Sequence, residues 1–120
     1  MNKEDLKNRT KVFAHRCVKL ALSLPKTILG RHISGQLIRC STSVASNYRA
    51  VCIAQSRATF ISKLAIVIEE ADETAFWVEF MVEENLVKSA RVADLLKEAG
   101  QLTAIFVASQ QTARKNQKKA

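Results

Sequence analysis

The sequence predicts an all-α protein, an antiparallel up-down-up-down four-helix bundle, and three observations lead to this fold class. Apolar residues recur with helical spacing along four successive segments joined by short connections. One proline and three glycines in 120 residues are too few turn-forming residues for an all-β sandwich. At 48% hydrophobic and 25% charged residues, the composition is that of a single globular domain and not of a disordered or fibrous chain.

The first predicted helix runs from about Lys3 to Leu24 and stops there because the residue before Pro25 avoids the helical backbone region. Its apolar stripe consists of Leu6, Phe13, Cys17, Leu20, Ala21 and Leu24. The second predicted helix runs from about Arg31 to Ala54. Its apolar stripe consists of Ile33, Leu37, Val44, Tyr48 and Val51. This helix is rich in serine and other small residues of moderate helix propensity, so we expect packing against a neighbouring helix to hold it.

The third predicted helix, from about Arg57 to Leu86, is apolar on two sides. Its core stripe is predicted to be Phe60, Leu64, Ile68, Ala71, Ala75, Val78 and Val82. The opposite side mixes large apolar residues with glutamates, and it forms the candidate oligomer interface: Ile66, Glu69, Glu73, Phe76, Trp77, Phe80 and Met81. A helix with two apolar faces is buried on both. Because aromatic residues are typical interface anchors, we expect a second copy to cover this face, the alternative being a neighbouring helix or the carboxy-terminal tail.

The fourth predicted helix runs from about Ser89 to Thr112. Its apolar stripe consists of Val92, Leu95, Leu96, Ala99, Leu102 and Phe106. Gly100 inside it costs up to about 1 kcal/mol relative to alanine and suggests a close helix crossing. The predicted organisation is one bundle domain over residues 1–113 and a basic, flexible tail over residues 114–120.

The formal net charge of +8 is divided unevenly along the chain. Residues 1–60 hold 11 basic and 2 acidic residues, whereas residues 61–120 hold 8 basic and 9 acidic ones. Such a basic half is compatible with a polyanionic ligand, and equally with an internal or intersubunit match to the acidic third helix.

No motif in the sequence indicates catalysis. The only carboxylate cluster, residues 69–73, is not followed by a histidine at the Glu-x-x-His spacing of di-iron bundles, and the only histidines are His15 and His32. A G-x-S-x-G motif and a glycine-rich phosphate loop are also missing. We therefore predict a protein that is not an enzyme, without metal or cofactor.

The chain has three cysteines, Cys17, Cys40 and Cys52, without the spacing of a zinc site or a disulfide framework. It also has no apolar run long enough to span a membrane and no signal-peptide core at its start. These features predict a cytoplasmic protein with reduced thiols and no membrane partner.

The remaining polyanionic ligand is RNA or DNA, which requires several cations on one surface. The first helix carries Lys7, Lys11, Arg16 and Lys19 on its polar side, and the second carries Arg31, Arg39 and Arg49. We take these seven as candidate nucleic-acid-binding residues. Aromatic residues are sparse on these faces, which favours recognition of the backbone or of shape over stacking on single-stranded bases.

One stretch resembles a known family. Leu24-Pro25, the run from Gln36 to Ala50 (Gln-Leu-Ile-Arg-Cys-Ser-Thr-Ser-Val-Ala-Ser-Asn-Tyr-Arg-Ala), Phe60-Ile61-x-Lys63-Leu64 and Glu69-Glu70-Ala71-Asp72-Glu73-Thr74-x-x-Trp77 are similar to the bacterial four helix bundle proteins. That family includes proteins encoded in intervening sequences of 23S ribosomal RNA genes and, distantly, the accessory protein of diversity-generating retroelements. The resemblance implies an antiparallel bundle, a ring-like homopentamer and, from the retroelement branch, nucleic-acid binding through basic surfaces.

Two hypotheses therefore stand together. In the first, a homo-oligomer binds RNA or DNA through the basic faces. In the second, a structural or adaptor oligomer with a protein partner pairs its basic faces with the acidic third helix of the next subunit.

Overall fold

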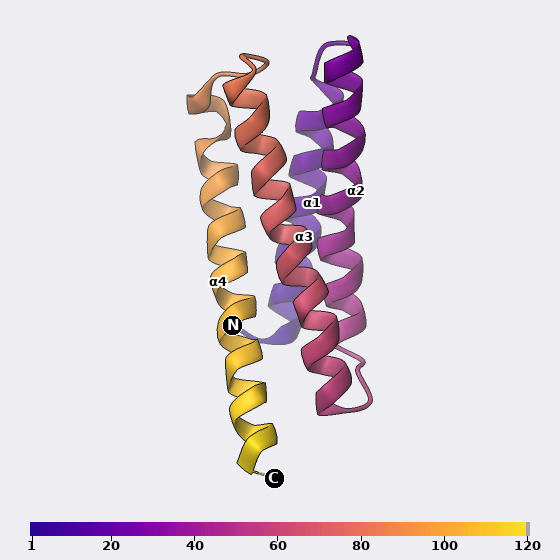
Figure 1. The fold of residues 1–120 in the computed structure, drawn as a ribbon, viewed down its shortest axis with the longest axis vertical. Coiled ribbons are helices and arrows are strands. Elements are labelled where there is room, and N and C mark those ends of the chain that lie inside the picture. Colours follow the sequence, from indigo (N-terminus) through magenta and orange to yellow (C-terminus); the bar gives the residue numbers. More distant parts are fainter. Residues whose placement is uncertain (120) are drawn as a thin grey trace.

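The computed structural model describes residues 1–119, with side chains up to Lys118. This part of the chain folds into four long helices that alternate in direction, as Figure 1 shows, so the predicted up-down-up-down bundle is confirmed. The helices are α1 (Lys3–Leu22), α2 (Ile28–Val51), α3 (Arg57–Glu83) and α4 (Ser89–Lys119). The bundle is elongated, with extents of 52 × 22 × 21 Å.

Three helices begin at a polar residue that caps their free backbone N–H groups. Asn2 and Asp5 form a reciprocal capping box at α1, in which the Asp5 N–H donates to Asn2 Oδ1 at 2.8 Å. Thr27 Oγ1 accepts from the Gly30 N–H at α2, at 3.0 Å, and Ser56 Oγ accepts from the Thr59 N–H at α3, at 3.1 Å. These caps fix where each helix starts.

Five helix boundaries differ from the sequence prediction. Helices α1, α2 and α3 end at Leu22, Val51 and Glu83, two or three residues before their predicted ends. Helix α2 begins at Ile28 and not at Arg31, because the Thr27 cap starts the helix directly after the turn at Pro25. Helix α4 continues to Lys119, well beyond Thr112, so residues 114–118 of the predicted tail are helical. Ala120 and the side chain of Lys119 belong to that predicted tail but lie outside the described residues.

The core is formed by the predicted stripes of α1, α2 and α4, with the exception of Leu96, which is only half-buried. In α3 the stripe is rotated. Leu64, Ala71 and Val78 are buried as predicted, but the fully buried positions beside them are Val67, Thr74 and Met81. The other predicted positions, Phe60, Ile68, Ala75 and Val82, are half-buried. The reason is that α3 packs against both α2 and α4, so each side of its stripe meets a different neighbour.

Helices α1 and α4 make the fewest contacts of the four adjacent pairs. A polar link joins them: the Arg9 guanidinium donates to both carboxylate oxygens of Glu98, at 2.7 Å each, and to Gln101 Oε1 at 2.8 Å. This bond lowers the pKa of Glu98 below its ordinary value. This ion pair therefore contributes to the contact between α1 and α4, where packing is least extensive.

Gly100 does not mark a close helix crossing. It is exposed on α4, and a Cβ atom added to it would meet no atom within 4 Å. The crowded glycine is Gly30, whose added Cβ would overlap the backbone oxygen of Pro25. The need for glycine thus lies at the α1–α2 turn and not in α4.

Candidate nucleic-acid interface

A long groove lies between the outer surfaces of α1 and α2, with a volume of about 720 Å³. Three of the predicted cationic residues line it, Lys7 and Lys11 from α1 and Arg49 from α2. The remaining lining residues are His15, three small polar residues and a narrow apolar floor: Asn8, Thr42, Ser46, Ala14, Val18 and Ala45. We call this set the α1–α2 groove. No carboxylate is among its lining residues.

One cation of this groove has a described carboxylate partner outside it: Lys7 Nζ donates to Glu4 at 3.1 Å. This is an exposed pair one turn apart on α1, with 69% of the Glu4 side chain accessible. Such surface pairs contribute little and exchange readily with another anion. The positive charge of the groove is therefore accessible to a ligand.

The other two predicted cations of α1 lie on a different side of the molecule. Arg16 and Lys19 line a smaller groove of about 240 Å³ between α1 and α4, where Arg91 joins them. Arg16 also lies close enough to Glu98 to lower the pKa of that carboxyl, together with Arg9. The four cations of α1 thus belong to two separate grooves, and the second groove has a carboxylate nearby.

The predicted cations of α2 are also divided. Arg31 is exposed on α2 about five turns before Arg49, too far along the helix to share its groove. Arg39 turns toward α3, where its guanidinium donates to Glu70 at 3.2 Å and to Glu73. The basic second helix and the acidic third helix thus meet within one chain at Arg39, so this arginine is neutralised in place.

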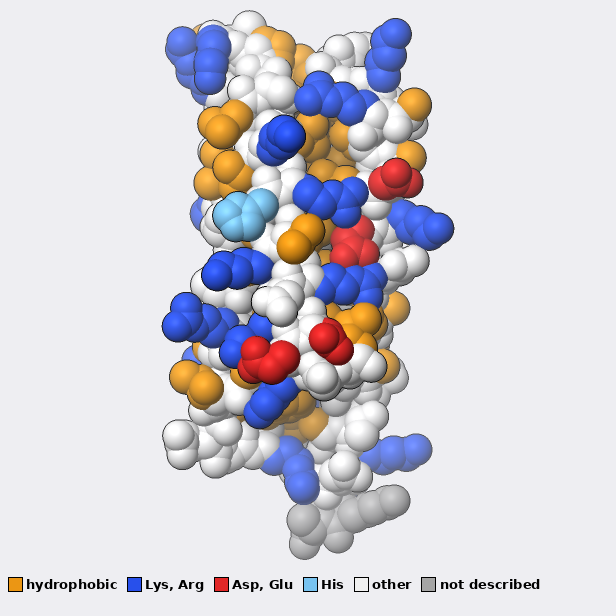
Figure 2. Space-filling model, turned by 180° about the vertical axis from the view of Figure 1, so that it is seen from behind, with side chains coloured by type: hydrophobic (Ala, Val, Ile, Leu, Met, Phe, Trp, Pro, Cys, Tyr) orange, Lys and Arg blue, Asp and Glu red, His pale blue; other side chains and the backbone are white. Residues whose placement is uncertain are grey.

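Figure 2 shows the side of the molecule on which α1 lies in front. Lys and Arg side chains are spread along its whole length, while Asp and Glu form a few small groups. The α1 side is therefore a basic surface as a whole, and its α1–α2 groove is larger than its α1–α4 groove.

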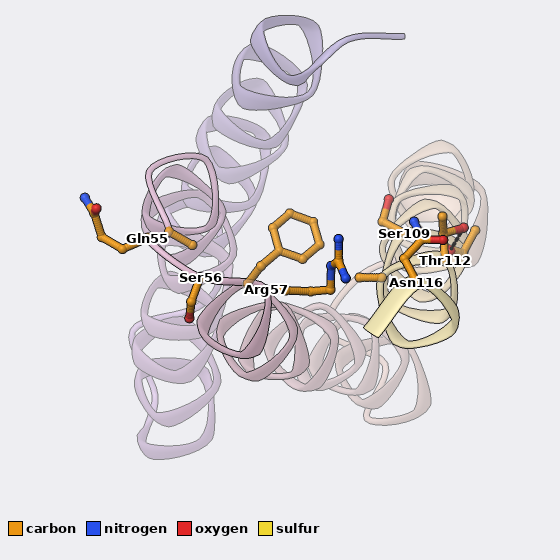
Figure 3. A pocket seen from close by; sticks show the side chains of 10 residues that line it. Gln55, Ser56, Arg57, Ser109, Thr112 and Asn116 are labelled. Atoms are coloured by element: carbon orange, nitrogen blue, oxygen red, sulfur yellow. Dashed lines mark hydrogen bonds between the residues drawn. The ribbon is translucent and has the colours of Figure 1, made fainter. Parts of the chain in front are cut away.

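An open groove of about 770 Å³ lies at the end of the bundle, where the start of α3 faces the last turns of α4. Figure 3 shows Arg57 reaching across from α3 toward the α4 residues Ser109, Thr112 and Asn116, while Gln55 and Ser56 point away. Arg114, Lys115 and Lys118 line a shallow pocket beyond it on α4. This end of the molecule is basic, but Arg57 is the one cation that lines the groove itself.

The outer face of α3 carries an exposed aromatic cluster. Phe76 is 50% exposed and Ile66 is 42% exposed. The ring of Phe76 stacks on Phe80 at 5.7 Å between centroids and meets Trp77 edge-on at 5.0 Å. Exposed carboxylates surround these rings: Glu69, Asp72, Glu79 and Glu83. An apolar face with acidic borders is thus accessible on α3.

Three residues of the predicted interface are placed differently. Glu73 is half-buried and accepts a hydrogen bond from Arg39 of α2. Met81 is fully buried in the core, so it does not belong to the exposed face. Trp77 is half-buried at the edge toward α2, where its Nε1–H donates to Glu73 at 3.3 Å and its ring meets His32 edge-on at 5.5 Å. The exposed face therefore centres on Ile66, Phe76 and Phe80.

The cysteines are free thiols, and Cys17 and Cys40 are buried in the core. Burial raises the pKa of Cys17 to about 12 and also raises that of Cys40. Neither thiol is therefore activated as a nucleophile. Within the described residues, no three His, Cys, Asp or Glu side chains are placed to hold a metal ion.

Sequence reasoning missed the polar partners of the groove, namely Asn8, His15, Thr42 and Ser46. Their only signal is their spacing on the solvent sides of two helices, and which solvent side faces the groove depends on how α1 and α2 pack.

None of the described helices has a stretch long and apolar enough to cross a membrane.

These features define an α-helical bundle protein with a basic α1–α2 groove and an acidic, aromatic outer face. The chain belongs to the family of 23S rRNA-intervening sequence proteins, whose family model matches residues 3–108. It is similar to the crystal structure of a protein of unknown function from the S23 ribosomal protein family of Bacteroides thetaiotaomicron. That similarity has a TM-score of 0.79 at 27% sequence identity and covers 92% of this chain and 99% of the other. No curated protein matches the chain significantly.

Proposed function

We propose that this protein is a non-enzymatic, homo-oligomeric helical bundle that binds nucleic acid through its basic helix faces as an accessory protein. The observation that carries the proposal is the α1–α2 groove, in which cations from two helices face a common hollow without a carboxylate lining it. Phosphate backbones bind where several Lys or Arg side chains share one surface, because each neutralised phosphate releases counterions.

The family adds support for the ligand class. The name of the matching family links its members to intervening sequences of 23S ribosomal RNA. For this chain we therefore propose RNA or DNA as the partner. We also propose the cytoplasm as its location, since free buried thiols such as Cys17 and Cys40 are typical of a reducing compartment.

The assembly part of the proposal rests on α3. Exposed Phe76 and Ile66 with their acidic borders have the composition of an interface core and rim. We propose that a second copy covers this face, and that the ring is a pentamer, which is the state that the family resemblance implies.

A second candidate function is favoured by the same α3 face. An exposed aromatic cluster is also the surface that a structural or adaptor protein would offer to a different protein partner, without any nucleic acid. The two candidate functions differ in whether nucleic acid co-purifies with the protein.

Native mass spectrometry of the protein purified from cells, with and without nuclease treatment, tests the proposal. We expect a closed homo-oligomer, with extra mass that disappears after nuclease treatment. An oligomer with the same mass in both samples and no retention on immobilised nucleic acid would favour the adaptor function. A monomer without bound nucleic acid would contradict both candidates.

A further inference from the structure

We infer that the α1–α2 groove binds the phosphodiester backbone of a nucleic-acid duplex, with Lys11 and Arg49 as its principal cations. This inference rests on the proposed function and assigns it to one surface and one form of nucleic acid.

The α1–α2 groove differs from the other basic surfaces in having fewer carboxylates beside its cations. Arg39 is neutralised by Glu70 and Glu73, and the α1–α4 groove lies next to Glu98. In the α1–α2 groove only Lys7 has a described carboxylate partner, the exposed Glu4. Lys11 and Arg49 line this groove from two different helices. Cations contributed by two helices along one hollow complement a run of phosphates.

The other side chains that line the groove are short and either polar or apolar, apart from His15. Asn8 can donate hydrogen bonds to phosphate and sugar oxygens, which are the commonest polar contacts of proteins with nucleic-acid backbones. The hydroxyls of Thr42 and Ser46 donate to backbone carbonyls of α2, at 2.7 Å to Ile38 and 3.4 Å to Ser43, and a hydroxyl can rotate to donate to a bound phosphate instead. Alanine and valine form the floor, so the backbone can approach closely. The groove therefore combines charge with short hydrogen-bond donors.

The residues that line the groove suit a duplex better than a single strand. Proteins that bind single strands without sequence preference stack bases on aromatic side chains. No Phe, Tyr or Trp lines the α1–α2 groove, and the aromatic cluster of α3 lies on an acidic face. A duplex keeps its bases paired and stacked and presents only its backbone, which matches what this groove offers.

The experiment compares two matched pairs of substitutions in the oligomeric protein. The groove variant carries Lys11→Gln and Arg49→Gln. The control carries Arg57→Gln and Lys97→Gln, which lie outside the seven candidate binding residues, so both variants lose the same charge at exposed positions. Circular dichroism checks that each variant stays folded. Fluorescence anisotropy then measures binding of a duplex and of one of its strands over a salt series of about 50 to 200 mM.

We expect the wild type to bind the duplex at least about tenfold more tightly than the strand. In the groove variant, duplex affinity should fall about tenfold, and the slope of log affinity against log salt should flatten by about 1.8, at about 0.9 for each lost phosphate contact on B-form DNA. The control variant should retain most of the duplex affinity and most of the salt slope.

Three results would overturn the inference in distinguishable ways. Equal losses of duplex affinity in the two variants would show diffuse charge attraction. The proposed function would then stand, but the groove would be excluded as the specific binding site. Equal or tighter binding of the single strand would exclude a duplex site. No binding of either form by the wild type would remove the proposed function itself.

Discussion

At the residue scale, Gly30 is the position where a single methyl group decides the local structure. Its N–H donates to the Thr27 cap, and an added Cβ would overlap the Pro25 backbone oxygen and crowd Thr27 Oγ1 at 3.1 Å. Gly30→Ala must therefore displace the α1–α2 turn. We expect it to lower the free energy of unfolding by about 1–3 kcal/mol, the range for overpacked sites.

Chemical denaturation with urea measures this change. Unchanged or higher stability of the Gly30→Ala variant would show that the turn can shift without cost.

A second residue-scale prediction concerns the Arg9–Glu98 ion pair. Because the pair lowers the pKa of Glu98 in the folded state, it stabilises the fold above the ordinary carboxyl pKa of 4.5. That stabilisation is lost as the pH falls through the lowered pKa of the folded state. Glu98→Gln should therefore cost about 1 kcal/mol at neutral pH, and the difference from wild type should shrink at acidic pH.

Urea denaturation over pH 3 to 7, a range of roughly four units around the ordinary carboxyl pKa, measures this effect. The exposed carboxylate of Asp94 on the same helix provides the control, Asp94→Asn. If the Glu98→Gln and wild-type stabilities ran parallel at all pH values, the pair would not contribute as described.

At the element scale, α4 carries a glycine that packing within the chain does not require. Gly100 is exposed, and its added Cβ meets nothing within 4 Å. Gly100→Ala should therefore raise the free energy of unfolding by about 1 kcal/mol, the difference in helix propensity. The same chemical change thus has opposite signs at Gly30 and at Gly100.

Thermal unfolding followed by circular dichroism checks this, with an expected rise in the midpoint of about 4 °C or more. A lower midpoint would indicate that this surface of α4 is crowded in the assembly.

Helix α3 carries the apolar face that we propose a second copy covers. Packing against α2 and α4 uses Leu64, Val67 and Met81, and the opposite side still exposes Phe76 and Ile66. Single exposed apolar residues are ordinary, but stacked aromatic rings at the centre of a face are typical of interfaces.

At the scale of the whole molecule, the double variant Ile66→Ser with Phe76→Ser should convert the proposed oligomer into monomers. The reason is that the removed apolar area is the centre of the proposed interface. Light scattering after size-exclusion chromatography measures the mass. The control, Val12→Ser with Leu22→Ser, removes exposed apolar side chains of α1 instead. Loss of assembly in the control alone would move the interface to α1.

The proposed assembly would also raise the affinity of the protein for a polyanion. Each chain contributes a net charge of +8, which ring formation would multiply. A ring would therefore hold several α1–α2 grooves on one polyanion, so the affinity of the assembly would exceed that of one chain.

The sequence by itself determined the fold class, the order and direction of four helices, and most of the core. It did so because helical periodicity is a local property: Leu37 and Phe106 are buried where their spacing places them. The start of α2 was missed because the Thr27 cap, which accepts from the Gly30 N–H, was not recognised.

Only the tertiary structure decided which polar sides face each other. Rotation of α3 between two neighbours buried Met81 and left Phe76 exposed, and pairing with α3 withdrew Arg39 from the basic surface. Packing of α1 on α2 placed Lys11 and Arg49 in one groove, whereas Arg16 lies in another. A helix presents polar residues over a wide arc, so their partners depend on its rotation about its axis, which the packing of the neighbouring helices sets.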